Sequence, residues 1–425
     1  MSLDPQPLTL MEGDCVDQVN RIHLAVLLGF LAALAPLSID MYLPALPTMN
    51  EEFNAGTSII QMTLTMTMVG MAIGQLFAGP ISDRFGRKYP LAVGMTFFTL
   101  STVGCIFSDD IVHFLIFRFI QGLSGSFGIV VARAIARDIY KGAELTKFIS
   151  LLMLVNGLAP ILAPVIGGQI LVFTHWRGIF VVLAIVGLML ILSSLSLNET
   201  LPDEFRMKDI YSSFKTFGTI LHDKYFFGHC LIQFTIFAAF FAYISGSPFL
   251  FQNIYHVSPQ MYSFIFGGLG AFMALSGLIP IRLAGRVADI KMMTWAVVQA
   301  LVGSIIFMLC IIFHMPIAFT IVSLVIFVST IPVFGAASFS LSMRYHAKEA
   351  GAASAIFGFS SMFSSGLVAP LVGIGGSSDA LPMAILIFIG ALATLIIFFK
   401  TIYTLHHRGY LITHNMLNVF AEHKE

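Results

Sequence analysis

Residues 22–46, IHLAVLLGFLAALAPLSIDMYLPAL, are almost wholly apolar and hold a single formally charged side chain, Asp40. A run of this length suffices for one helix to cross a bilayer, because the hydrocarbon core takes roughly 20 residues. The whole chain has the same character, since 57% of its 425 residues are hydrophobic and only 10% are charged. A soluble surface needs about a quarter of charged residues, so the composition excludes a water-soluble protein.

Twelve apolar runs, bounded by charged residues, glycine and proline, predict an all-α membrane protein with twelve transmembrane helices in two six-helix halves. The runs lack the period-two alternation of a β-barrel, and their backbone must satisfy its own hydrogen bonds in lipid. They fall at 22–46, 59–79, 91–107, 112–131, 148–172, 179–197, 225–251, 260–281, 292–313, 317–343, 352–374 and 382–399.

The longest hydrophilic stretch divides the chain six helices from six. We therefore expect an N-terminal tail 1–21, a first half 22–197, a linker 198–224, a second half 225–399 and a C-terminal tail 400–425. This layout is typical of transporters whose two halves rock about a site near the bilayer midplane.

Lysine and arginine predict the orientation in the membrane. All but two of the 22 lie in the tails or in loops on the same side, and only Arg177 lies in a loop on the other side. The positive-inside rule then places both termini and the linker in the cytoplasm. Ala33-Leu34-Ala35 resembles a signal-peptidase site, but the acidic residues before Arg21 argue against cleavage.

Two formally charged side chains fall inside the predicted spans, Asp40 in the first and Arg118 in the fourth. A charge in hydrocarbon is costly unless it is paired or faces water, so both mark functional positions. Both lie about 9 Å below the same surface, at 1.5 Å per residue, and this depth allows an ion pair. Asp40 could carry a proton while Arg118 tunes its acidity. Alternatively, the two side chains only pin two helices together or reach to the interface.

Uncharged polar and aromatic side chains within the spans form a candidate substrate cavity. Some would simply bond to a neighbouring helix, and an aromatic side chain more often faces lipid or the core. The spacing in span seven is only partly that of one helix face, as a wide cavity would require. The candidates are Tyr42, Gln121, Asn156, His229, Gln233, Phe237 and Phe241.

The loop after span two, Gly79-Pro80-Ile81-Ser82-Asp83-Arg84-Phe85-Gly86-Arg87-Lys88, resembles the G-x-L-x-D-R-x-G-R-K-x signature of the major facilitator superfamily. Its glycines permit tight turns, and Asp83 could dock on a helix N-terminus or a neighbouring arginine. The resemblance implies a conformational gate that latches the halves in the outward-open state. The gate residues are Gly79, Asp83, Arg84, Gly86, Arg87 and Lys88, with Asp138 resembling the partner of the loop arginines.

Two further patterns resemble the superfamily's twelve-span drug:proton antiporters. Arg118-Phe119-Ile120-Gln121-Gly122 is similar to an R-x-x-Q-G element associated with proton coupling. The antiporter signature resembles Gly157-Leu158-Ala159-Pro160, continuing through Pro164 to Gly167-Gly168. Prolines remove hydrogen bonds on one face of a helix and glycines let another helix approach, so we expect this segment to kink and pack closely.

Within these antiporters, residues 36–47 and 133–138 look like the bicyclomycin/chloramphenicol resistance (Bcr/CflA) subfamily. The resemblance implies a bacterial inner-membrane exporter of small amphipathic drugs, driven by protons and able to work as a monomer. Ala32 occupies a position where some related exporters carry a second acid, which puts the coupling stoichiometry and the acceptance of cationic drugs in doubt. Export of an endogenous amino acid or peptide is an alternative that the same motifs would serve.

Other functional classes are less consistent with the sequence. No loop is long enough for a catalytic domain, and no P-loop suggests ATP, so we expect neither an enzyme nor a cofactor. The net charge is zero, which argues against a nucleic-acid partner. The four cysteines, Cys15, Cys105, Cys230 and Cys310, are too far apart to suggest disulfides or a metal site.

Overall fold

The computed structural model describes residues 18–207, 211–344, 346 and 349–407. Twelve of its helical segments are long and apolar enough to cross a membrane, which confirms the predicted number of spans. The described residues begin at Gln18 and end at His407. Most of the two predicted tails therefore lies outside them, as does Cys15.

The first half comprises the spans built from α1 to α7. The first span is broken into α1 (Gln18–Asp40), the 3-10 turn η1 (Leu43–Ala45) and α2 (Leu46–Glu52). The next five are α3 (Thr57–Phe85), α4 (Lys88–Ile106), α5 (Ile111–Ile139), α6 (Gly142–Phe173) and α7 (Trp176–Ser196). A linker follows, with the turn η2 (Asp203–Phe205) and helix α8 (Tyr211–Leu221).

The second half comprises the spans built from α9 to α17. They are α9 (Lys224–Phe249) with the π-helix η3 (Leu250–Ile254), α10 (Pro259–Ser276) with α11 (Leu278–Leu283), α12 (Asp289–Ile312) and α13 (Ile317–Val328) with α14 (Thr330–Met343). The last two are α15 (Ala350–Val372) with η5 (Gly373–Gly375), and α16 (Leu381–Ile397) with η6 (Phe398–Tyr403) and α17 (Thr404–His407).

Several helices are longer than the apolar runs that predict them. Helix α3, the second span, continues through the polar residues after Gly79. It ends at Phe85, and the next residue, Gly86, has a φ of +86°, in the left-handed region that glycine adopts readily. Likewise α5 continues to Ile139. Hydropathy measures the part of a helix in lipid, whereas the helix itself stops at a backbone signal.

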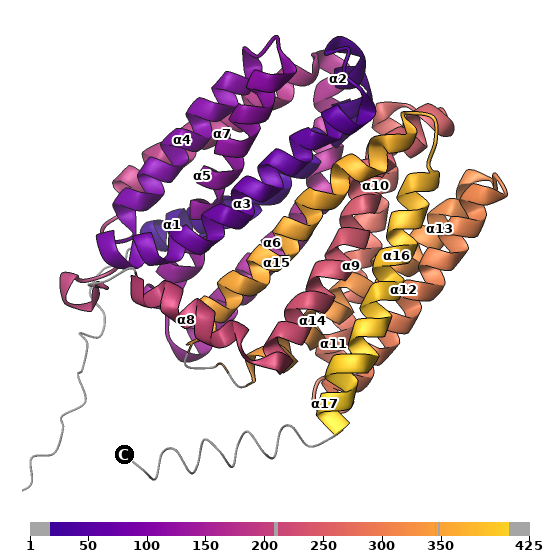
Figure 1. The fold of residues 1–425 in the computed structure, drawn as a ribbon. Helices are drawn as coiled ribbons and strands as arrows, with labels where there is room; N and C mark the ends of the chain where they lie inside the picture. Colours follow the sequence, from indigo (N-terminus) through magenta and orange to yellow (C-terminus); the bar gives the residue numbers. More distant parts are fainter. Residues whose placement is uncertain (1–17, 208–210, 345, 347–348, 408–425) are drawn as a thin grey trace, which may run out of the picture.

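The bundle has two ends. The terminal end carries the start of α1, the linker and α17, and the distal end carries the loops around residues 53–56, 107–110, 174–175 and 376–380 (Figure 1). The halves meet along two seams, where α3 packs on α15 and α6 packs on α10. These seams bring helices from the two parts of the sequence side by side and set the frame for the site.

The core continues across the halves, and the outer surface is apolar. One buried cluster joins residues of both halves, including Tyr42, Met68, Tyr243 and Phe266. A second cluster packs Phe217 and Ile220 of α8 against α9 and α15, so the linker helix is anchored on the second half. Outward-facing side chains such as Leu192 and Val322 are 62% and 58% exposed, as expected for helices that face lipid.

Candidate functional site

Asp40 lies where the first span breaks. Helix α1 ends at Asp40, and the chain makes a turn before η1 and α2 continue the span. Pro44, four residues later, has no amide hydrogen to donate to the Asp40 carbonyl, and Pro47 has none for Leu43. The prolines therefore stop the α-helix at the acid, which is 6% exposed.

Helix α6 packs closely against the break in the first span. A Cβ atom on Gly167 would come within 1.8 Å of the Met41 carbonyl oxygen, so only glycine lets the two backbones touch. A Cβ on the next residue, Gly168, would come within 2.2 Å of the Ser263 hydroxyl on α10. Two of the three glycines of the predicted antiporter segment thus make close contacts, one within the first half and one across to the second.

The rest of that segment is less crowded. Pro160 and Pro164 lie inside α6, which continues through both to Phe173. A Cβ on Gly157 would meet nothing within 4 Å. Ile161, between the prolines, packs on Gly267 and Gly270 of α10, so the segment forms one seam between the halves.

Arg118 of α5 is completely buried and is held by neutral groups. Its guanidinium donates to the Ser38 carbonyl at 3.1 Å and to the Gln121 side-chain oxygen. The rings of Tyr42 and Phe180 lie 4.4 and 5.6 Å from its central carbon. Ser38 belongs to the last turn of α1, where carbonyls lack helical partners and the dipole favours a cation, so Arg118 caps the broken helix.

Asp40 and Arg118 do not form an ion pair in this structure. The salt bridges found among the described residues do not include this pair, although the equal depths of the two side chains allow one. Equal depth does not determine which way a helix faces. Asp40 instead lies within electrostatic range of Tyr243 on α9 and Tyr262 on α10, across the interface.

A chain of polar contacts extends from Arg118 through the first half. Gln121 donates to the Thr102 hydroxyl at 2.7 Å, and Thr102 donates to the Phe98 carbonyl. Tyr42 lies 3.0 Å from the Thr63 hydroxyl. Because Thr63 donates its own hydrogen to the Ile60 carbonyl, Tyr42 must be the donor. Tyr42 and Gln121 therefore surround Arg118 and fix its position.

The other predicted cavity residues lie apart from Arg118. His229 is buried near the terminal end of α9, 3.0 Å from the Ser338 hydroxyl, whereas Arg118 lies near the distal end of α5. Gln233 and Phe241 are buried and Phe237 partly buried, and Phe240 makes edge contacts with both phenylalanines. Asn156 is partly exposed on α6. The seven candidates thus fall into at least two groups.

The predicted gate residues come together at the terminal end. Arg87 contacts the Asp83 carboxylate, and its Nε donates to Asp138 on α5 at 2.9 Å. Burial opposes the charge of Arg87, but the bond to Asp138 and the charge of Asp83 outweigh burial and raise the pKa of Arg87. Of the loop arginines, Arg87 thus contacts Asp138, the partner that the resemblance implies.

The other members of the loop differ in environment. A Cβ on Gly79 would lie 3.9 Å from the Val130 side chain of α5, an ordinary contact distance. Arg84 is exposed and lies over the Phe85 ring, and Lys88 is partly exposed at the start of α4. Asp83 docks on an arginine rather than on a helix N-terminus, which settles the choice that the sequence leaves open.

Glu199 is a member of this cluster that the sequence analysis missed. Its carboxylate accepts hydrogen bonds from the backbone N–H groups of Arg87, Lys88, Thr200 and Leu201. A Cβ on Gly86 would come within 2.3 Å of its oxygen. Burial raises the pKa of Glu199, but the four N–H bonds outweigh burial and lower it. An acid directly after an apolar run is the only sequence signal of this helix-capping role.

Three of the four cysteines lie within the described residues. Cys105, Cys230 and Cys310 are buried free thiols. Within the described ranges, no group of three His, Cys, Asp or Glu side chains is arranged to hold a metal ion.

Comparison with known proteins shows the family to which this chain is related. The sequence profile of the Major Facilitator Superfamily matches residues 28–370. The Bacillus subtilis (strain 168) protein "Uncharacterized MFS-type transporter YdgK" is 40% identical over 384 residues, which cover 89% of this chain and 95% of that protein. A "Bicyclomycin resistance protein homolog" of Haemophilus influenzae is 32% identical over 56% of this chain and 61% of its own length.

Solved structures show the same fold at low sequence identity. The xylose transporter XylE from E. coli, in a partially occluded inward open conformation, superposes with a TM-score of 0.69 at 14% identity. The match covers 89% of this chain and 97% of that one. The predicted fold class is confirmed. The chain belongs to the Major Facilitator Superfamily, so it is a multi-pass membrane transporter rather than an enzyme.

Proposed function

We propose that this transporter is a drug:proton antiporter that exports small amphipathic molecules across the bacterial inner membrane by alternating access. The partial similarity to a bicyclomycin resistance protein homolog supports a drug substrate. The single observation that carries the coupling mechanism is the position of Asp40. This buried acid lies at the break of the first span, between the halves, and makes no salt bridge to a described residue.

The chemistry of Asp40 suits a proton carrier. Burying a carboxylate without a cation is costly, whereas the neutral acid is tolerated. Asp40 can therefore hold a proton while the site is closed and release it when water reaches the site. Its neighbours Tyr243 and Tyr262 belong to the second half, so any rocking of the halves changes its surroundings.

Arg118 acts as a positioning residue in this proposal. It caps α1 through the Ser38 carbonyl and so fixes the end of the helix where Asp40 lies. Its cation is balanced by carbonyl, amide and aromatic groups, which leaves the acid free to change its charge state.

The halves, orientation and gate complete the proposal. We assign residues 22–197 and 225–399 to the two moving halves, 198–224 to a cytoplasmic linker, and 1–21 and 400–425 to cytoplasmic tails. The Asp83–Arg87–Asp138 cluster joins α3 to α5 and acts as the conformational gate. A monomer contains all of these parts.

Proton-driven flux in liposomes tests the function. In vesicles with an imposed proton gradient, substrate moves against proton flow through the wild type and is not driven through Asp40→Asn. Asp109→Asn, which alters a 95% exposed carboxylate, is the matched control and retains coupling. Gradient-driven transport by Asp40→Asn contradicts the proposal.

A second candidate function is export of an endogenous amino acid or peptide. It stands because the similar Bacillus protein, which matches nearly the whole chain, is a transporter without a named substrate. An export panel of antibiotics and metabolites in an efflux-deficient host, with and without a protonophore, separates the two. Protonophore-sensitive export of metabolites alone selects this second function.

A further inference from the structure

Two glutamines cross between the halves at the distal end. Gln61 of α3 donates its amide to the Ser245 carbonyl of α9 at 3.0 Å. Gln252 of η3 donates to the Pro44 carbonyl of η1, also at 3.0 Å. Each half therefore supplies one amide donor to a backbone acceptor of the other half, and neither bond involves a charged group.

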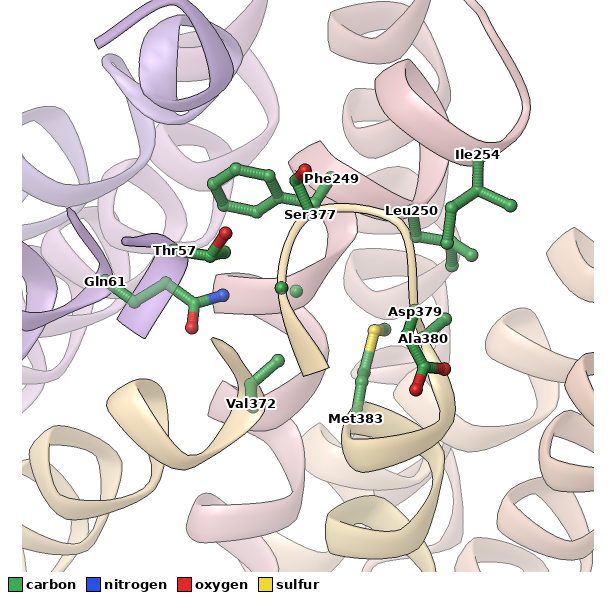
Figure 2. Close-up of a pocket in the computed structure, with 12 residues that line it drawn as sticks. Thr57, Gln61, Phe249, Leu250, Ile254, Val372, Ser377, Asp379, Ala380 and Met383 are labelled. Carbon is green, nitrogen blue, oxygen red and sulfur yellow. The ribbon is translucent and has the colours of Figure 1, made fainter. Parts of the chain in front are cut away.

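The region around Gln61 is tightly closed. Gln61 is 1% exposed, and Figure 2 shows its amide pointing away from α3 into a pocket bordered by Phe249 and Val372. The cavity there is about 10 Å³, room for roughly one water molecule. A Cβ on Gly373 would come within 2.5 Å of the Gln61 side-chain oxygen, so η5 also packs on the amide. This cavity is too small to hold a drug-sized molecule.

Prolines leave carbonyls available for bonds between the halves. Pro47 has no amide hydrogen to close a 3-10 bond to Pro44, whose carbonyl accepts from Gln252. Pro370 likewise cannot bond to the Gly366 carbonyl four residues earlier, and that carbonyl accepts from the Thr65 hydroxyl at 2.7 Å. The backbone groups that the helices cannot satisfy are thus satisfied across the interface, which favours this closed arrangement.

We propose that Gln61 and Gln252 form a distal latch, an uncharged pair of hydrogen bonds that holds the distal end shut and opens in each transport cycle. The inference rests on the alternating access of the proposed function. Opening separates two donors from two acceptors, and water that enters from the distal side replaces the lost partners. A latch of ordinary hydrogen bonds keeps the closed state favoured without making opening rare.

Distances between spin labels across the distal end test the latch. Labels on His113→Cys of α5 and Met261→Cys of α10, in a background with Cys15, Cys105, Cys230 and Cys310 replaced by alanine, report the separation of the halves. Without substrate or gradient, we expect Gln61→Leu or Gln252→Leu to raise the ratio of distal-open to closed molecules about fivefold. The double variant should raise it about 25-fold if the two bonds act independently.

Gln299→Leu is the matched control. Gln299 also donates an amide to a carbonyl at 3.0 Å, that of Ile326, and to the Ser329 hydroxyl, but all three residues lie in the second half. Its removal should leave the distance distribution unchanged. An unchanged distribution in the double glutamine variant, or an equal shift in Gln299→Leu, overturns the proposal.

A steric variant tests the latch independently of glutamine. Gly373→Ala places a methyl group against the Gln61 amide and the Ser58 backbone, at a φ of −79° that alanine adopts without strain. It should open the distal end, whereas Gly268→Ala, where a Cβ meets nothing within 4 Å, should not. If the glutamine variants fail to fold, a closed distal end in Gly373→Ala rejects the latch. Because the readout needs no protons, it can succeed even where the Asp40 tests fail.

Discussion

Arg118 shows how the chain can bury a cation that makes no salt bridge to a described residue. Its donors meet the carbonyl of Ser38 and the side chain of Gln121, and aromatic rings cover the guanidinium. This arrangement stabilises the buried cation most when its donors keep a fixed planar geometry, which the guanidinium of arginine has and the ammonium of lysine does not. The residue therefore links the fourth span to the end of α1, where Asp40 lies.

Substitution of Arg118 tests this role. Lysine keeps the charge and one donor toward Ser38, so we expect Arg118→Lys to transport about tenfold more slowly. Arg118→Ala removes the cap and should abolish coupled transport. Initial rates in energised vesicles measure both, and Arg137→Ala on the exposed face of α5 serves as the control. Wild-type transport by Arg118→Ala would remove this residue from the mechanism.

The sequence identifies the two charged positions but not their relation. Hydropathy and residue counting place Asp40 and Arg118 at the same depth, and the structure places Arg118 on the backbone of α1. Which way a helix faces depends on tertiary packing, and the proline-induced break after Asp40 changes that direction. Glu199 was missed because its ligands are backbone N–H groups, which no sequence motif displays.

At the scale of the helical element, glycine on α6 determines how closely the helices pack. The Met41 carbonyl lies where a Cβ of Gly167 would be, whereas Gly157 on the same helix faces open space. Both glycines belong to one sequence pattern, so the pattern alone gives them equal weight. Only the contact geometry distinguishes them.

Substitution by alanine should affect stability and transport differently at these two glycines. Gly167→Ala forces the backbones of α6 and the first span apart and should lower stability by about 2 kcal/mol or more, with loss of transport. Gly157→Ala should keep both close to wild type. Thermal unfolding in detergent and vesicle transport measure the difference. Equal effects of the two substitutions would refute the assignment of Gly167 to the tight contact.

His346 joins two further elements at the terminal end. Its ring lies 3.0 Å from Asp223, the N-cap of α9, and 3.6 Å from Glu349 beside the start of α15. The hydrogen bond to Asp223 raises the pKa of His346 above its usual 6.5, and burial opposes this rise only in part. The charged pair therefore stabilises the fold below about pH 6.5, and this contribution is lost as pH rises through the raised value.

Thermal unfolding of the wild type and of His346→Gln between pH 5 and 8 tests this pH dependence of stability. We expect the free energy of unfolding of the wild type to exceed that of the variant by about 1 kcal/mol at pH 5. This difference should shrink toward pH 8. A difference that grows with pH would show that the ring is neutral in the folded protein.

At the scale of the whole molecule, the predicted number of spans and the fold class are confirmed, because both follow from hydropathy and span length. The residue bounds of the two halves, the linker and the tails stay a prediction. The seams of α3 with α15 and of α6 with α10 join segments far apart in the chain, and nothing in their sequences specifies the pairing. The glycines and prolines at these seams are visible in the sequence, but their partners are not.

The gate should influence the whole conformational equilibrium. Arg87 contacts the carboxylates of Asp83 and Asp138, and Asp83→Asn removes the first of these negative charges. Since the resemblance assigns this loop to the state with the distal end open, we expect that state to lose population about fivefold. Spin labels at Tyr89→Cys and Lys291→Cys measure it, with Asp203→Asn, an exposed carboxylate, as the control. Identical distributions would exclude Asp83 from the gate.

Asp40 holds its proton in the closed site and should release it when substrate and water reach that site. The most direct test adds substrate to purified protein in weakly buffered detergent and records proton release with a pH-sensitive dye. We expect release by the wild type and by Asp109→Asn, and none by Asp40→Asn, which still binds substrate. Undiminished release by Asp40→Asn would contradict this expectation.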